Sequence, residues 1–181
     1  VLFFSDHGCH FRTRNGEYKR SPHDASIRVP LVAHGPGFDG CRRLSELVSL
    51  IDLPPTLCET AGVDVPDSMR GRSLLGLFGD RRSRWPDDVF VQISESMVGR
   101  AVRTDRWKYA AYAPELDGGR DPAADRYEDY CLYDLRNDPW EQENLVGRAE
   151  YAGVISEMRQ RLRTRMRQAG EGEAVIDAPQ R

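Results

Sequence analysis

Apolar runs and turn residues predict two strands in the first part of the chain. Residues 1–4 (VLFF) are all apolar, and residues 29–33 (VPLVA) form a second, largely apolar run. The turn sequence Gly35-Pro36-Gly37 ends that second run. Short apolar runs bounded by turn residues are typical of strands that lie in a core. We therefore expect residues 1–4 and 29–33 to be strands.

Helical spacing follows the second strand. Four apolar residues recur three or four positions apart and predict a helix: Leu44, Leu47, Val48 and Ile51. Asp52 is a suitable N-cap for a further short helix, because Pro54 and Pro55 are tolerated only in a first turn. We expect Gly62 to end this helix. Its predicted apolar face consists of Leu57, Cys58 and Ala61.

The second half of the chain has a different pattern. Four short segments, residues 89–93, 100–103, 107–113 and 131–135, read as strands separated by turns and predict an antiparallel sheet. One amphipathic helix follows, with a predicted buried face of Ile155, Met158, Leu162 and Met166.

The polar, breaker-rich residues 79–86 separate the two patterns, so we expect one domain over residues 1–80 and a smaller one over residues 81–181. Strands followed by helices predict an α/β class for the first domain. The second is predicted to be a small antiparallel sheet packed with a C-terminal helix.

Composition and charge exclude several kinds of protein. The 181 residues are 39% hydrophobic and 30% charged, which is typical of an ordered chain rather than a disordered one. The net charge of −3 argues against a nucleic-acid partner, although five arginines lie on the predicted C-terminal helix. We interpret these arginines as a solvated outer face. No apolar stretch reaches the roughly 18–20 residues that span a bilayer, so no membrane partner is expected.

The cysteines and histidines give no metal-site pattern. The four cysteines contain no C-x-x-C pair, which argues against a zinc ribbon or a disulfide-rich scaffold. A group of four residues near the N-terminus, His7, Cys9, His10 and His23, also fits no usual spacing for structural zinc.

The tetrapeptide Ser5-Asp6-His7-Gly8 directly follows the first predicted strand. Ligands of open α/β sheets bind outside the carboxyl ends of the strands. Asp6 and His7 can both reach one cation there, because the chain no longer alternates as it leaves the strand. A turn in which Asp6 caps a backbone amide is the alternative, and these four residues alone leave both open.

Further motifs follow in an order that is more specific than any one of them. They are residues 5–8 (SDHG), 18–19 (YK), 24–26 (DAS), 27–31 (IRVPL), 35–37 (GPG), 50–57 (LIDLPPTL), 61–63 (AGV), 69–74 (MRGRSL) and 133–139 (YDLRNDP). With this succession the chain resembles the C-terminal portion of the sulfatase family, within the alkaline phosphatase superfamily. The resemblance implies an alkaline-phosphatase-like sheet with flanking helices for the first domain.

The resemblance also implies roles for individual residues. Asp6 and His7 correspond to metal ligands, and Lys19 to the catalytic lysine that contacts the sulfate and stabilises the leaving oxygen. Many sulfatases carry Asn where this chain has His7. The resemblance implies Ca²⁺ first. Because imidazole suits calcium less well than oxygen ligands do, His7 leaves Mn²⁺ or Mg²⁺ as alternatives. His23 is predicted to contact substrate, with packing behind the site as its alternative.

The nucleophile implied by the family is absent from this chain. Sulfatases use a formylglycine made from the Cys or Ser of a C-x-P-x-R or S-x-[P/A]-x-R motif, and no cysteine or serine here fits that pattern. We therefore expect the formylglycine upstream of Val1, and we expect this chain alone to be inactive. It is interpreted as the C-terminal fragment of a sulfuric ester hydrolase.

The expected substrate of the full protein is a small-molecule or carbohydrate sulfate ester. A phosphodiesterase or phosphonate monoester hydrolase of the same superfamily is the first alternative, because sulfuryl and phosphoryl transfer need similar groups. A non-catalytic binding or assembly domain is the alternative from another class.

Overall fold

The computed structural model describes the backbone of residues 1–179, and the side chains of residues 1–79 and 82–179. The last two residues of the predicted second domain, 180 and 181, lie outside the described residues. Two compact units are present. Unit 1 comprises Val1–Asp6 and Val29–Val89, and unit 2 comprises His7–Arg28 and the chain from Phe90 on. The chain therefore leaves unit 1 after Asp6, builds part of unit 2, and returns. Each unit is described by itself.

Unit 1 contains both strands predicted in the first part of the chain. β1 (Leu2–Phe4) and β2 (Leu31–Ala33) pair antiparallel, with Phe3 opposite Val32. The core of this unit is a cluster of three buried leucines, Leu53, Leu74 and Leu77. The 3₁₀ helices η2 (Leu74–Phe78) and η3 (Asp80–Arg84) follow one another near its end.

The helix predicted from the spacing of Leu44 to Ile51 is wrong. Only the last part of that stretch is helical, as the 3₁₀ helix η1 (Leu50–Asp52). The backbone amide of Ser49 donates to the carboxylate of Asp52 at 2.8 Å, and this capping box starts the helix at residue 50. Leu44 still packs against the leucine cluster from an irregular backbone. Burial did not follow the predicted face either, because Leu44, Leu47 and Val48 are only half-buried and Ile51 is 58% exposed.

The next helix, α2 (Leu53–Thr60), begins as predicted, with prolines in its first turn and Asp52 before it. Gly62 follows its end at a φ of +67°, which confirms the predicted stop. The predicted apolar face is wrong, because Leu57 is 56% exposed whereas Thr56 is buried. The hydroxyl of Thr56 donates to the carbonyl of Asp52 at 2.5 Å and accepts from the amide of Leu74 at 2.8 Å. These two bonds turn the Thr56 side of the helix inward.

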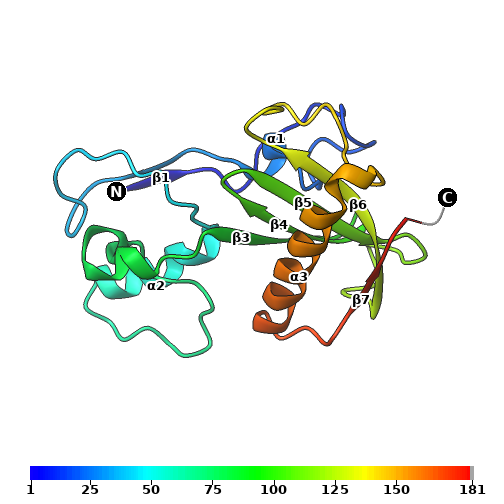
Figure 1. The fold of residues 1–181 in the computed structure, drawn as a ribbon. Coiled ribbons are helices and arrows are strands. Elements are labelled where there is room, and N and C mark those ends of the chain that lie inside the picture. The colour runs from blue at the N-terminus through cyan, green and yellow to red at the C-terminus, as the bar shows by residue number, and fades with distance from the viewer. Residues whose placement is uncertain (180–181) are drawn as a thin grey trace. The chain divides into compact units, whose positions relative to one another are not determined.

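Unit 2 is built on a five-stranded sheet (Figure 1). Its strands, in spatial as well as chain order, are β3 (Asp88–Ile93), β4 (Val98–Thr104), β5 (Trp107–Ala113), β6 (Arg126–Asp134) and β7 (Val175–Asp177). β4 with β5 and β5 with β6 are antiparallel, whereas the short β7 runs parallel to β6. All four segments predicted as strands lie in this sheet.

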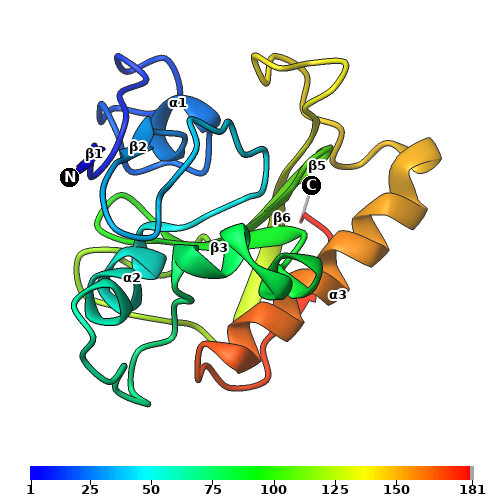
Figure 2. The ribbon, with the colours of Figure 1, turned by 90° about the vertical axis from the view of Figure 1, so that its left-hand side faces the viewer.

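The long helix α3 (Ala152–Gln168) lies across one face of this sheet, as Figures 1 and 2 show. The 3₁₀ helix η4 (Ala149–Tyr151) leads into it, and the short helix α1 (Asp24–Ile27) lies in the N-terminal part of the unit. The four predicted apolar residues of α3 are all buried, in one cluster with Val102, Tyr109 and Leu132. This sheet with its C-terminal helix confirms the predicted fold class.

Two arginines of α3 pair with carboxylates of the same unit. Arg159 contacts the buried carboxylate of Asp129 at 2.6 Å, and Arg161 pairs with Glu157 at 3.2 Å. Over the described part of the chain, no helix has the length and apolar character needed to cross a membrane.

Leu162→Ala and Leu57→Ala test the two helix faces with the same chemical change. Leu162 is fully buried against the sheet, so its truncation should lower the free energy of unfolding by about 2–5 kcal/mol. Leu57 is 56% exposed, and its truncation should change stability by no more than about 0.5 kcal/mol. Denaturant unfolding of both variants measures the difference. Equal losses would contradict the orientation of α2.

Candidate functional site

The segment from His7 to Ser26 is a long loop that local hydrogen bonds close. The amide of Gly8 donates to the carbonyl of Ser26 at 2.7 Å, and the amide of His10 donates to that of Tyr18 at 2.8 Å. A Cβ atom on Gly8 would lie 2.0 Å from the carbonyl oxygen of Ala25, so only glycine fits there. The start of the loop is thereby attached to α1.

Two predicted site residues, His7 and Lys19, meet in this loop. The Nζ atom of Lys19 lies 3.0 Å from Nε2 of His7, and Nδ1 of His7 lies 2.8 Å from the carbonyl oxygen of Gly8. A carbonyl oxygen only accepts, so Nδ1 carries the proton and Nε2 presents a lone pair to the ammonium. The ring of Tyr18 also lies near this ammonium, 5.4 Å from Nζ to its centroid.

Asp6 and His7 have suitable donor atoms for part of a metal site. The carboxylate of Asp6 is exposed, and neutral imidazole, the form His7 takes here, is the form that binds metals. In this structure the Nε2 lone pair of His7 accepts from Lys19. Among the residues whose side chains are described, no group of three or more His, Cys, Asp or Glu could hold an ion. Two side chains supply only part of a complete shell, and their role as ligands remains a prediction.

His23 is enclosed within unit 2. It is 3% exposed, its Nδ1 lies 3.1 Å from the hydroxyl of Ser21, and its Nε2 lies 3.2 Å from that of Tyr133. Burial, reinforced by the positive charges of Arg14 and Lys108, lowers the pKa of His23 to about 3. The ring is therefore neutral at physiological pH. These contacts give His23 a packing role, and its contact with substrate remains a prediction.

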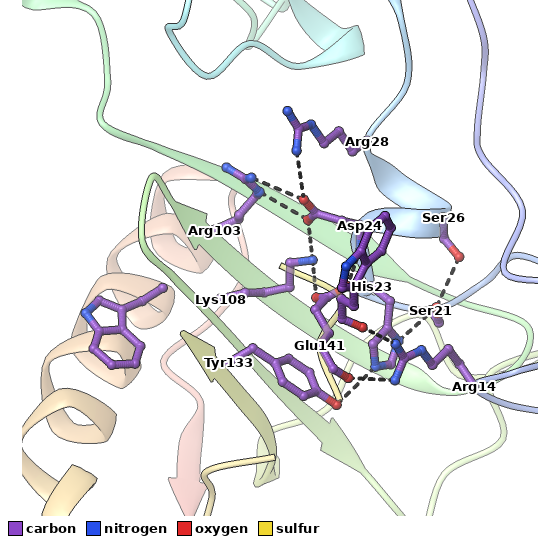
Figure 3. A network of polar contacts seen from close by, with 12 residues as sticks. Arg14, Ser21, His23, Asp24, Ser26, Arg28, Arg103, Lys108, Tyr133 and Glu141 are labelled. Carbon is purple, nitrogen blue, oxygen red and sulfur yellow. Dashed lines mark hydrogen bonds and ion pairs between the residues drawn. The ribbon is translucent and has the colours of Figure 1, made fainter. Parts of the chain in front are cut away.

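Beside His23, a buried ion-pair network fixes the start of α1 (Figure 3). The carboxylate of Asp24 pairs with the ammonium of Lys108, which is 0% exposed, and with the guanidinium of Arg103 at 3.2 Å. Burial alone would raise the pKa of Asp24, but Arg103 and Lys108 outweigh it and lower that pKa below its ordinary value. Asp24 is thus held as a carboxylate.

Glu141 completes the network from the turn that follows β6. Its carboxylate contacts Nζ of Lys108 at 2.5 Å and accepts from the backbone amide of Asp24 at 2.7 Å. Arg14 donates to the carbonyls of Glu141 and Trp140 at 2.7 and 2.6 Å, so the loop and the turn are joined directly. The network therefore connects β5, α1, the loop and this turn within one unit (Figure 3).

Sequence reasoning missed this network. Arg28 pairs with one member of this network, the Asp24 carboxylate, from the surface, where its side chain is 75% exposed and its Nη1 lies 3.9 Å from Oδ2. One signal was available, because Lys108 is the one charged residue in the otherwise apolar and aromatic β5. A buried lysine needs a counter-charge. The identity of that counter-charge, 33 residues away at Glu141 and 84 away at Asp24, was not readable from spacing.

Comparison with known proteins places the chain in a family. Residues 16–168 match the family model described as "N-sulphoglucosamine sulphohydrolase, C-terminal". The chain belongs to the sulfatase family, in its C-terminal portion. The matched region contains Lys19, His23 and the residues of the ion-pair network from Asp24 onward, whereas Asp6 and His7 precede it.

Individual relatives agree with this assignment. Arylsulfatase K of Bos taurus is 32% identical over 174 residues, which cover 91% of this chain and 30% of that protein. A sulfatase candidate from Bacteroides thetaiotaomicron matches in structure with a TM-score of 0.76 and 28% identity, over 94% of this chain and 36% of the other. The phosphonate monoester hydrolase of Agrobacterium radiobacter matches with a TM-score of 0.68 and 25% identity, over 93% and 35%. The chain thus spans about a third of the length of each of these proteins.

Lys108→Met tests the ion-pair network. It leaves Asp24 and Glu141 buried without their shared cation, so the free energy of unfolding should fall by about 3–5 kcal/mol. Arg136→Met is the matched control, because Arg136 pairs with Asp105 while both are exposed, and its loss should cost at most about 1 kcal/mol. Denaturant titration of both variants provides the comparison. A loss no larger than that of the control would mean that the network contributes no stability.

The buried, neutral His23 predicts a pH dependence of stability. Its pKa is about 3 in the folded chain and 6.5 ordinarily, so between these values the unfolded chain binds more protons. Acidification from pH 7 to pH 5 should therefore lower the free energy of unfolding by about 2 kcal/mol through this residue. His23→Gln, which cannot titrate, should lose that part of the slope. An unchanged slope in the variant, measured by urea unfolding at several pH values, would refute this assignment.

Proposed function

We propose that this chain supplies the C-terminal share of the active site of a sulfuric ester hydrolase. The observation that carries the proposal is the 3.0 Å approach of Lys19 to His7 within a chain of the sulfatase family. The relative from Bos taurus is named for aryl sulfates, and the matching family model for a sulphoglucosamine. We therefore propose an aryl or carbohydrate sulfate ester as the substrate class.

Lys19 is the residue to which we assign a catalytic role. A sulfate ester is anionic, and further negative charge develops on its bridging oxygen as the S–O bond breaks. A fixed ammonium that donates a hydrogen bond to this oxygen stabilises that charge with little reorganisation. The hydrogen bonds that close the loop hold the backbone of Lys19 before any substrate arrives, which supports such a role.

Asp6 and His7 are the residues we propose as ligands of a divalent cation. Asp6 offers carboxylate oxygens and His7 offers Nε2, and Ca²⁺ is the first candidate, with Mn²⁺ or Mg²⁺ next. A cation on Nε2 would take the lone pair that accepts from Lys19 here, and the ammonium would then be released toward the sulfate ester. When bound, such a cation supplies positive charge to the sulfate oxygens. The other ligands and the formylglycine nucleophile are expected from the part of the protein outside this chain. The chain by itself is accordingly expected to be inactive.

A phosphonate monoester hydrolase is the second candidate. The structural match to the enzyme of Agrobacterium radiobacter favours it, and so does His7 at a position where many sulfatases carry Asn. Lys19 would act in the same way on either ester, because both leaving oxygens gain negative charge. Parallel assays of the full-length protein on an aryl sulfate and on an aryl phosphonate monoester distinguish the two activities. A preference for the phosphonate would replace the first proposal by the second.

Lys19→Ala in the full-length enzyme tests the catalytic role. Loss of one electrostatic contact made mainly in the transition state should lower kcat roughly 10²–10³-fold, with a smaller effect on KM. Lys19→Arg should restore only part of the rate, because the planar guanidinium places its charge differently. The measurement is steady-state kinetics on an aryl sulfate, with a melting curve to establish folding.

Arg12→Ala is the matched control for this experiment. Arg12 is exposed, lies in the same loop and also carries one positive charge, so its removal should leave kcat close to the native value. A near-native kcat for Lys19→Ala, or an equal loss for Arg12→Ala, would show that Lys19 has no specific part in catalysis.

A further inference from the structure

His10 lies inside the loop that carries Lys19, and nothing in its sequence context marked it beyond a rejected zinc pattern. It is 2% exposed, and its Nε2 lies 2.6 Å from the carbonyl oxygen of Lys19. The backbone of His10 is bonded as well. Its amide donates to the carbonyl of Tyr18, and its carbonyl accepts from both the amide and the hydroxyl of Thr13. His10 thus bonds both carbonyls that flank the Cα atom of Lys19, those of Tyr18 and of Lys19 itself.

The protonation of His10 follows from its partner. The carbonyl of Lys19 only accepts, so Nε2 of His10 carries a proton and donates it. The other ring nitrogen, Nδ1, is buried and has no hydrogen-bond partner. Leaving a buried acceptor unpaired costs free energy, and an aliphatic side chain would avoid that cost. An aliphatic side chain would, however, be unable to donate to Lys19.

The carbonyl of Lys19 has one further donor, and it is weaker. The hydroxyl of Ser26 lies 3.4 Å from the same oxygen, against 2.6 Å for His10. The bond from the side chain of His10 is therefore the stronger of the two bonds that hold the Lys19 carbonyl. On the other side of the same residue, Nζ of Lys19 meets Nε2 of His7 at 3.0 Å. His10 thus holds the backbone of Lys19, while the side chain of Lys19 reaches His7.

We infer that His10 is a positioning residue, which fixes the backbone of Lys19 so that its ammonium reaches the Nε2 side of His7. The geometric part of this inference concerns the chain as it stands, and its catalytic consequence rests on the proposed function. His10 does not touch the reacting atoms. It acts by removing the freedom of the peptide that carries Lys19, so the ammonium needs no rearrangement when charge develops.

Three substitutions separate positioning from packing. The side-chain amide of His10→Gln places its nitrogen where Nε2 of the imidazole lies and can still donate to Lys19. His10→Asn has the same amide but is one carbon too short, and His10→Leu fills space without a donor. His34→Leu is the matched control, because His34 is exposed and belongs to the other unit.

The first readout is the ¹⁵N chemical shift of Nε2 of His7, measured on this chain by long-range ¹H–¹⁵N spectra of its imidazoles. The native chain and His10→Gln should show the shift of a nitrogen that accepts a hydrogen bond from Lys19. His10→Asn and His10→Leu should move this shift toward that of Lys19→Met, which has no ammonium to donate. An unchanged His7 signal in both of these variants would overturn the inference. Failure of all three His10 variants to fold would also overturn it, because His10 would then be required for folding as such.

The second readout is kinetics of the full-length enzyme. His10→Asn and His10→Leu should lower kcat roughly 10²-fold with little change in KM, and His10→Gln should restore most of the rate. A native full-length protein without activity on sulfate or phosphonate esters would refute the proposed function, while the Nε2 shift of His7 would still decide the role of His10. Equal rates for the Gln and Leu variants would refute positioning.

Discussion

The buried ammonium of Lys108 is the constraint on which the candidate site depends. A charge with no exposed surface is stable only when counter-charges are held close to it, and here Asp24 and Glu141 fill that requirement. Asp24 is the first residue of α1, and Glu141 lies in the turn after β6. The lysine on β5 therefore fixes two segments outside the sheet, and Arg103 on β4 supplies a second cation to Asp24. Without Lys108, the buried carboxylate of Glu141 would lose the cation that it contacts.

The site loop is arranged around these fixed points. Its beginning is bound to α1 through the amide of Gly8, and its middle is bound to the turn through Arg14. His7 precedes the first attachment and Lys19 follows the second, and the two side chains meet while both are only partly buried. The arrangement combines a buried ion-pair network, which supports the loop, with two partly exposed side chains, Lys19 and His7, which can reach a ligand. Such a division is typical of sites that act by preorganised electrostatics.

The family match covers the same elements that hold this loop. The matched region runs to residue 168 and includes β5, the turn with Glu141 and most of α3. Lys108 lies on the sheet that α3 covers, so the helix that buries Leu162 and the lysine that holds α1 belong to one unit. Stability of the sheet and geometry of the loop are therefore coupled through shared elements.

The sequence by itself determined the strands of the sheet, the buried face of α3 and the family. It also marked Lys19 and His7, because alternation, helical spacing and motif order are local properties. Only the tertiary structure decided which face of α2 is buried, that the residues before Leu50 are irregular, and that Thr56 turns inward. It alone paired Lys108 with Asp24 and Glu141, and His10 with the backbone of Lys19. These features depend on hydrogen bonds and ion pairs between segments distant in the chain, and periodicity carries no information about which buried polar group will find which partner.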